Sequence, residues 1–173
     1  MADNTRYRDN EPKEFEERVV QVRRVTKVVK GGKRMGFRVL AIVGDRKGRV
    51  GMGLGKASEV SSAIRKSVEA AKKALVTIPL IGGTIPHEVV GKLGASSVLL
   101  RPAPSGKGVI AGGSVRVVLE LSGVRDVVAK SIGSSNAINT ARATIVALKG
   151  LKVQSDVEAL RNKKIDVRYV QNV

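Results

Sequence analysis

The stretch that decides the fold covers residues 32–64 and reads GKRMGFRVLAIVGDRKGRVGMGLGKASEVSSAI. Its apolar run at residues 37–43 predicts a strand, and the GDRKG sequence at 44–48 is typical of a hairpin turn. A second, shorter strand is expected at 49–54. The two glycines inside it indicate a bulge or a close approach of another backbone.

On either side of this stretch the pattern continues. Residues 19–29 are rich in valine and predict another strand, followed by a charged turn at 30–34. Ser58 is a plausible helix N-cap, with Glu59 in the first turn. An apolar stripe with helical spacing follows it, formed by Val60, Ile64, Val68, Ala71 and Leu75. The first half of the chain therefore predicts a β-β-β-α unit of 60 or so residues.

Charge points to a polyanionic partner. The 173 residues carry a formal charge of +17, and residues 18–56 hold twelve bases with Asp45 as their only acid. Residues 1–17 hold six acids and three bases, and we expect them to be a solvated tail. Lysine and arginine neutralise phosphates and release condensed counterions. Aromatic residues make up only 2% of the chain, so stacking on single-stranded bases is not expected, and recognition of the backbone and shape of folded RNA or duplex DNA is favoured.

Other compartments and chemistries are disfavoured. No apolar segment approaches the ~18 residues of a membrane span. The chain has no cysteine, which excludes disulfides and thiolate chemistry. His87 is the one histidine; without cysteine partners it cannot build a zinc site, and we expect it to be a strand residue.

Two glycine-rich loops resemble nucleotide-binding motifs only superficially. Residues 51–56 lack the P-loop spacing, because Val50 and Ala57 stand where glycine and a hydroxyl residue are required. Residues 106–111 match a loose dinucleotide pattern, but Pro102 and Pro104 precede it where a strand should lead in. We therefore predict no cofactor, no small-molecule substrate and no enzymatic activity.

The second half mixes strands and helices. Strands are expected at 87–92, 97–100 and 124–130, a loop at 102–108, and a short polar helix at 156–164. Residues 114–121 fit a strand or a helix equally well. Ser135 or Asn136 caps a helix that ends with Gly150 at C′, and its apolar face is formed by Ile138, Ala141, Ile145 and Leu148.

The decisive stretch also resembles a known family, the bacterial-type small-subunit ribosomal protein five family. The resemblance rests on the spacing of Gly32-Lys33, Phe37, Val39, residues 42–45 (IVGD), residues 48–53 (GRVGMG), Glu59-Val60 and Ala63-Ile64. A second block agrees, with residues 101–103 (RPA), Gly106, residues 108–113 (GVIAGG), Arg116, residues 118–120 (VLE), Ala129-Lys130, Gly133-Ser134, Asn136, Asn139 and residues 142–144 (RAT). The resemblance covers residues 19–160. Two positions depart from the family pattern: Lys107 stands where threonine is usual, and Ala137 stands where proline is common.

The resemblance implies an α+β fold, in which an N-terminal β-β-β-α double-stranded-RNA-binding-like domain precedes a small β-β-α-β-α domain, with residues 114–121 helical. It implies a place in the small subunit of a cytoplasmic or organellar ribosome, near the mRNA entrance region. Residues 26–34 would reach rRNA. Gly106, Gly108 and Arg116 would face ribosomal protein four, where the contact affects decoding accuracy, and ribosomal protein eight is the other implied neighbour.

We expect a charged tail at 1–17, an RNA-binding domain at 18–80, a C-terminal domain at 84–164 and a tail at 165–173. The hypothesis is a structural protein of the small ribosomal subunit that binds 16S-type rRNA, supports assembly and tunes accuracy. Its predicted rRNA-binding residues are Arg23, Arg24, Thr26, Lys27, Lys30, Gly31, Gly32, Lys33, Arg34, Arg46, Lys47, Arg49 and Lys56. The alternatives are an RNA chaperone or DNA-compacting protein acting off the ribosome, and a nucleotide-dependent enzyme.

Overall fold

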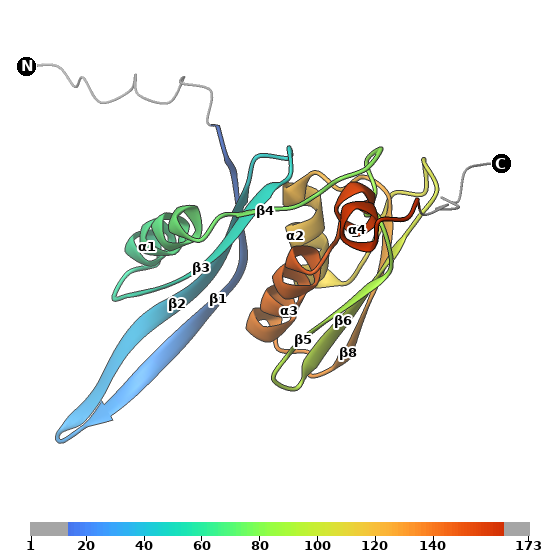
Figure 1. The fold of residues 1–173 in the computed structure, drawn as a ribbon. Helices are drawn as coiled ribbons and strands as arrows, with labels where there is room; N and C mark the ends of the chain where they lie inside the picture. Colours follow the sequence, from blue (N-terminus) through green and yellow to red (C-terminus); the bar gives the residue numbers. More distant parts are fainter. Residues whose placement is uncertain (1–13, 165–173) are drawn as a thin grey trace, which may run out of the picture.

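The computed structural model describes residues 14–164 as two four-stranded sheets and four α-helices (Figure 1). The elements are β1 (Glu16–Val29), β2 (Gly32–Gly44), β3 (Arg49–Ala57), α1 (Val60–Lys73), β4 (Val76–Thr77), β5 (Val89–Leu93), β6 (Ser96–Pro102), β7 (Val109–Ile110), α2 (Gly113–Ser122), β8 (Val127–Gly133), α3 (Ala137–Lys149) and α4 (Gln154–Arg161). No helix among these is long and apolar enough to cross a membrane.

The elements form four layers. The first sheet has the order β1-β2-β3-β4 and carries α1 on one face, while α2 packs on its other face. The second sheet has the order β5-β6-β8-β7, and α3 covers the side that faces the first sheet (Figure 1). One apolar cluster runs from Ile42 and Val50 of the first sheet through Leu119 of α2 to Leu100 of the second sheet. The two halves of the chain therefore share a core.

Strand β2 is the centre of the first sheet, and its residues 39–44 are all buried. Ala41 and Val43 pack in a cluster with Val68 and Ala71 of α1, whereas Ile42 belongs to the core shared with α2. A strand covered on both faces reads as a continuous apolar run instead of an alternating one. That is why the sequence predicted a strand here, although β2 extends well beyond the predicted 37–43.

The glycines of β3 let α1 lie directly on the sheet. A Cβ at Gly51, Gly53 or Gly55 would overlap the carbonyl oxygens of successive turns of α1, those of Ala71, Ser67 and Ala63 respectively. The β2–β3 register runs without a shift from Phe37 to Gly44. Of the two predicted meanings of these glycines, close backbone approach is confirmed and a bulge is wrong.

Several local predictions need correction in the first half. Helix α1 has Glu59 as its N-cap with no side-chain cap hydrogen bond, so Ser58 is not the cap and Glu59 is not in the first turn. Leu75 lies beyond the helix. The buried face of α1 contains Ala63 and Ser67 because only small side chains fit above the glycine row. Strand β1 begins at Glu16, so the last residues of the expected solvated tail belong to the sheet; residues 1–13 and 165–173 lie outside the described part.

In the second half the helical alternative for residues 114–121 is confirmed by α2, and Asn136 is confirmed as the cap of α3, where its side chain accepts from the Ile138 N–H. Strand β8 begins at Val127 instead of residue 124. His87 precedes β5 and accepts a hydrogen bond from the Lys152 N–H, so its expected place in a strand is wrong. Gly150 is the C-cap itself with right-handed backbone angles, not a left-handed C′ residue.

The β2–β3 turn docks on the C-terminal end of α2. The N–H groups of Arg46 and Gly48 donate to the carbonyl oxygens of Leu121 and Ser122, each at 3.0 Å. A Cβ at Gly44 would overlap the Leu121 carbonyl. Because the last carbonyls of a helix have no partner within the helix, this turn satisfies groups that would otherwise be left without a hydrogen bond.

Candidate nucleic-acid interface

The β1–β2 hairpin projects from the body as a two-stranded ribbon (Figure 1). Strand β3 pairs with β2 only from Phe37 onward, so residues 25–36 have no third strand beside them. Lys30 and Gly31 form the turn at the tip, and Gly31 has a φ of 88°, which glycine adopts without strain. The ribbon is long enough to reach well outside the body of the protein.

One face of this hairpin and of the adjoining end of β3 carries five bases in cross-strand rows. The register places Arg23 opposite Arg38 and Arg38 opposite Lys56, which makes one row across three strands. Nearer the tip, Lys27 lies opposite Arg34. Directly opposite residues of antiparallel strands point to the same face, and residues two apart in a strand share a face. These five side chains, the basic face, therefore lie on the side of the sheet away from α1.

No carboxylate balances the basic face. Residues 18–44 contain no aspartate or glutamate. Within residues 14–164, none of the ion pairs involves a side chain of the basic face. Like charges directly opposite each other destabilise a pair of strands. A surface that keeps three such pairs is electrostatically complementary to a polyanion lying across it.

The remaining predicted residues of the hairpin lie around this face. Arg24 and Thr26 of β1 and Lys33 of β2 point to the α1 side, and Lys30, Gly31 and Gly32 lie at the tip. Nothing in the described part of the chain comes within 4 Å of a Cβ built on Gly31 or Gly32. Lys30, Gly31 and Gly32 are all exposed, so a partner can reach the tip.

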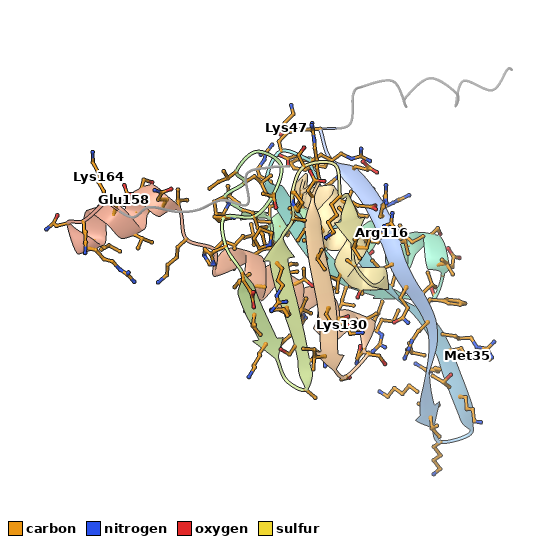
Figure 2. The ribbon with its side chains drawn as sticks, turned by 90° about the vertical axis from the view of Figure 1, so that its right-hand side faces the viewer. Met35, Lys47, Arg116, Lys130, Glu158 and Lys164 are labelled. Carbon is orange, nitrogen blue, oxygen red and sulfur yellow. The ribbon has the colours of Figure 1, made fainter. Side chains whose placement is uncertain are left out.

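The predicted rRNA-binding residues of the turn between β2 and β3 lie far from the tip of the hairpin. Arg46, Lys47 and Arg49 lie at the opposite end of β2, which has 13 residues; at about 3.3 Å per residue the two turns are roughly 40 Å apart. Figure 2 shows Lys47 at the end of the molecule opposite the ribbon. The structure thus does not bring the thirteen predicted residues into one patch.

Two of the three bases at this second turn are already paired. The Arg46 guanidinium contacts the Glu16 carboxylate at 2.6 Å, and this hydrogen bond lowers the pKa of Glu16. The Arg49 guanidinium contacts Asp45 at 2.6 Å and Glu14 at 2.9 Å, and it stacks over the Phe15 ring at 5.1 Å. These arginines are paired with acids at the end of the sheet where β2 meets β3, which leaves them less available to phosphates than the basic face.

Arg38 is the site residue that the sequence analysis missed. It lies at the centre of the basic face, between Arg23 and Lys56. The sequence holds a signal for it. When Lys30 and Gly31 alone form the hairpin turn, each residue of β1 from position 21 onward lies opposite the residue of β2 whose number, added to its own, gives 61. That rule puts Arg23 opposite Arg38 and Lys27 opposite Arg34.

The predicted protein-facing residues lie in α2 and in the loop that leads into β7. Gly106 and Gly108 lie in the loop before β7, both with positive φ, and the Gly108 N–H donates to the Asp126 carboxylate at 2.8 Å. Strand β7 contacts α2, which carries Arg116. The Arg116 guanidinium donates to Glu120 at 2.7 Å, and the other oxygen of Glu120 accepts from Arg18 of β1 at 2.6 Å. Glu120 therefore ties α2 to the base of the hairpin.

Comparison with known families covers both halves of the chain. The sequence profile described as "Ribosomal protein S5, N-terminal domain" matches residues 15–79, and "Ribosomal protein S5, C-terminal domain" matches residues 91–161. Together they cover more than three quarters of the chain. The chain belongs to the ribosomal protein S5 family.

Membership in the S5 family confirms the resemblance and the predicted α+β architecture with its double-stranded-RNA-binding-like first half. S5 is a structural protein of the small ribosomal subunit, not an enzyme. Within residues 14–164 no three histidine, aspartate or glutamate side chains gather as a metal site requires.

Proposed function

We propose that this chain binds small-subunit rRNA through the basic face of its β1–β2 hairpin. The observation that carries the proposal is the pair of like-charged rows, Arg23–Arg38–Lys56 and Lys27–Arg34, with no acid in residues 18–44. Phosphates lying across these rows relieve the repulsion between the bases. The released counterions add to the binding free energy. The mechanism is positioning: the ribbon holds RNA helices at a junction and so supports subunit assembly.

In this proposal residues 18–80 form the RNA-binding unit and residues 84–164 form the protein-binding unit. Gly106, Gly108 and Arg116 face ribosomal protein four, and ribosomal protein eight is a further neighbour, near the mRNA entrance region. Exposure of Gly106 and Arg116 supports a contact there. An interface on α2 that loosens during tRNA selection would tune decoding accuracy, because Glu120 links α2 to the hairpin.

The salt dependence of binding tests the basic face. Lys27→Ala with Arg34→Ala removes one like-charged pair, so the slope of log affinity for small-subunit rRNA against log salt should fall by about two, one unit for each phosphate that is no longer neutralised. The unfolding midpoint of the free chain should not drop, since the two bases repel each other. Filter binding over a salt series measures the slope.

Lys92→Ala with Lys130→Ala is the matched control, because it removes the same charge from the outer face of the second sheet. A slope that falls equally in both variants, or in neither, would show that the basic face is not the rRNA-binding surface. Arg116→Ala is the complementary arm of the same experiment: it should leave the rRNA slope unchanged and weaken binding of ribosomal protein four. If Arg116→Ala binds ribosomal protein four as tightly as the parent does, Arg116 does not face that protein.

A further inference from the structure

The opposite face of the ribbon is apolar near its tip. Val28 has 74% of its surface exposed and Met35 has 61%. Val28 lies opposite Lys33, and Met35 lies two residues along β2 from Lys33, so the two apolar side chains are diagonal neighbours on one face. Thr26, directly opposite Met35, completes this apolar face. Figure 2 shows Met35 on the projecting part of the ribbon.

Nothing in the described part of the chain covers this apolar face. Helix α1 packs on the same side of the sheet and covers β2 at Ala41 and Val43. It does not reach the part of β2 between Phe37 and the hairpin tip, where residues 32–35 are exposed. Large apolar side chains on an unprotected two-stranded ribbon favour association and aggregation. Their presence at the tip therefore indicates a surface that is covered when the protein is bound to its partner.

The charges around the apolar face identify the partner. Arg24 and Lys33 lie on the same face, and Lys27 and Arg34 lie on the reverse. With no acid between residues 18 and 44, an acidic protein surface or RNA would fit. RNA fits better because a nucleotide presents phosphate beside apolar base and ribose surfaces within a few ångströms. Protein wedges of methionine and aliphatic side chains pack against bases in this way, and unstacked bases occur at RNA junctions and loops.

We propose that Val28 and Met35 pack against unstacked bases or ribose surfaces of the rRNA while the basic face on the reverse neutralises phosphates. The ribbon is then inserted between two RNA elements and contacts RNA with both faces. The two faces contribute differently: one provides salt-dependent affinity and the other provides affinity that salt does not change. This inference rests on the proposed rRNA binding of the hairpin.

Val28→Thr with Met35→Gln tests the apolar face. Both replacements keep size and charge, and both sites are exposed, so the fold should persist with an unfolding midpoint close to that of the parent. The full-length variant should bind a small-subunit rRNA transcript about tenfold more weakly at every salt concentration, with an unchanged salt slope. Val90→Thr with Ile132→Thr is the control, since these side chains are also exposed, at 51% and 53%, but on the second sheet.

Affinity equal to that of the parent would overturn the inference. So would a variant that binds the bare transcript normally but fails to enter the subunit when the other ribosomal proteins are present, because the apolar face would then contact protein. The outcome for rRNA binding itself is separate: it is decided by the salt slope of Lys27→Ala with Arg34→Ala. If the salt slope falls as expected in Lys27→Ala with Arg34→Ala, but Val28→Thr with Met35→Gln binds like the parent, only the apolar contact is refuted and rRNA binding by the basic face stands.

Discussion

Glu120 is the residue whose surroundings connect the two halves most directly. A hydrogen bond from Arg116 lowers the pKa of the Glu120 carboxyl, desolvation opposes this, and a second hydrogen bond from Arg18 adds to the lowering. A carboxyl whose pKa is lowered by folding stabilises the folded state above its ordinary pKa of 4.5. That contribution disappears as the pH falls through the lower pKa of the folded state.

Glu120→Gln should therefore destabilise the chain at neutral pH by about 1 kcal/mol, a modest figure because the arginine partners are partly exposed. The difference in unfolding free energy between parent and variant should stay constant from neutral pH to about 5 and shrink below 4.5. Urea denaturation across this range measures it. Glu69→Gln, at an exposed position of α1, is the control. A difference that persists undiminished in acid would show that the carboxylate charge is not what holds the contact.

At the residue scale the sequence could not identify these ion pairs. Arg18 and Glu120 are separated by 102 positions, and nothing in either neighbourhood marks the other as its partner. The same holds for Arg46, which was predicted to bind RNA from its charge alone but contacts Glu16. Charge identifies candidate residues, whereas tertiary structure decides which of them are neutralised within the protein.

Among the elements, the contact of α1 with β3 depends on the absence of side chains in β3. Gly53→Ala should lower the free energy of unfolding by about 3 kcal/mol, because the new methyl group would overlap the Ser67 carbonyl oxygen and force α1 away from the sheet. Thermal or urea unfolding measures the loss. Gly113→Ala in the first turn of α2 is the matched control, since no atom lies within 4 Å of a Cβ there. Equal stability of the two variants would contradict the close packing of α1.

Elements were predictable where the pattern is local. The strands of the first hairpin follow from the valine-rich run and the apolar run at 37–43. The turn, predicted at 30–34, is shorter in the structure, since β2 begins at Gly32, and only the two-residue turn at 30–31 gives the register that opposes Lys27 to Arg34. Helix α2 was ambiguous because alternating valines fit both periods, and its assignment came from the family resemblance. Strand β7 has only two residues and pairs with β8 through a parallel contact that no local pattern indicates.

For the molecule as a whole, the fold separates two kinds of surface. The bases of the hairpin project from one end of the first sheet, whereas Arg46 and Arg49 at the other end of β2 are paired with acids. The shared core through Leu119 holds α2 against the first sheet. A displacement of α2 by a neighbouring protein would thus act on the base of the ribbon through Glu120.

The most direct test of rRNA binding by the hairpin uses the absence of cysteine from the chain. Thr26→Cys introduces a single thiol on the exposed ribbon, to which an iron chelate that generates hydroxyl radicals can be attached. In small subunits reconstituted with this protein, the rRNA should be cleaved in short clusters on both sides of one helical junction. Incorporation of the labelled chain with no cleavage above that of the cysteine-free parent would place the hairpin away from rRNA and contradict the account.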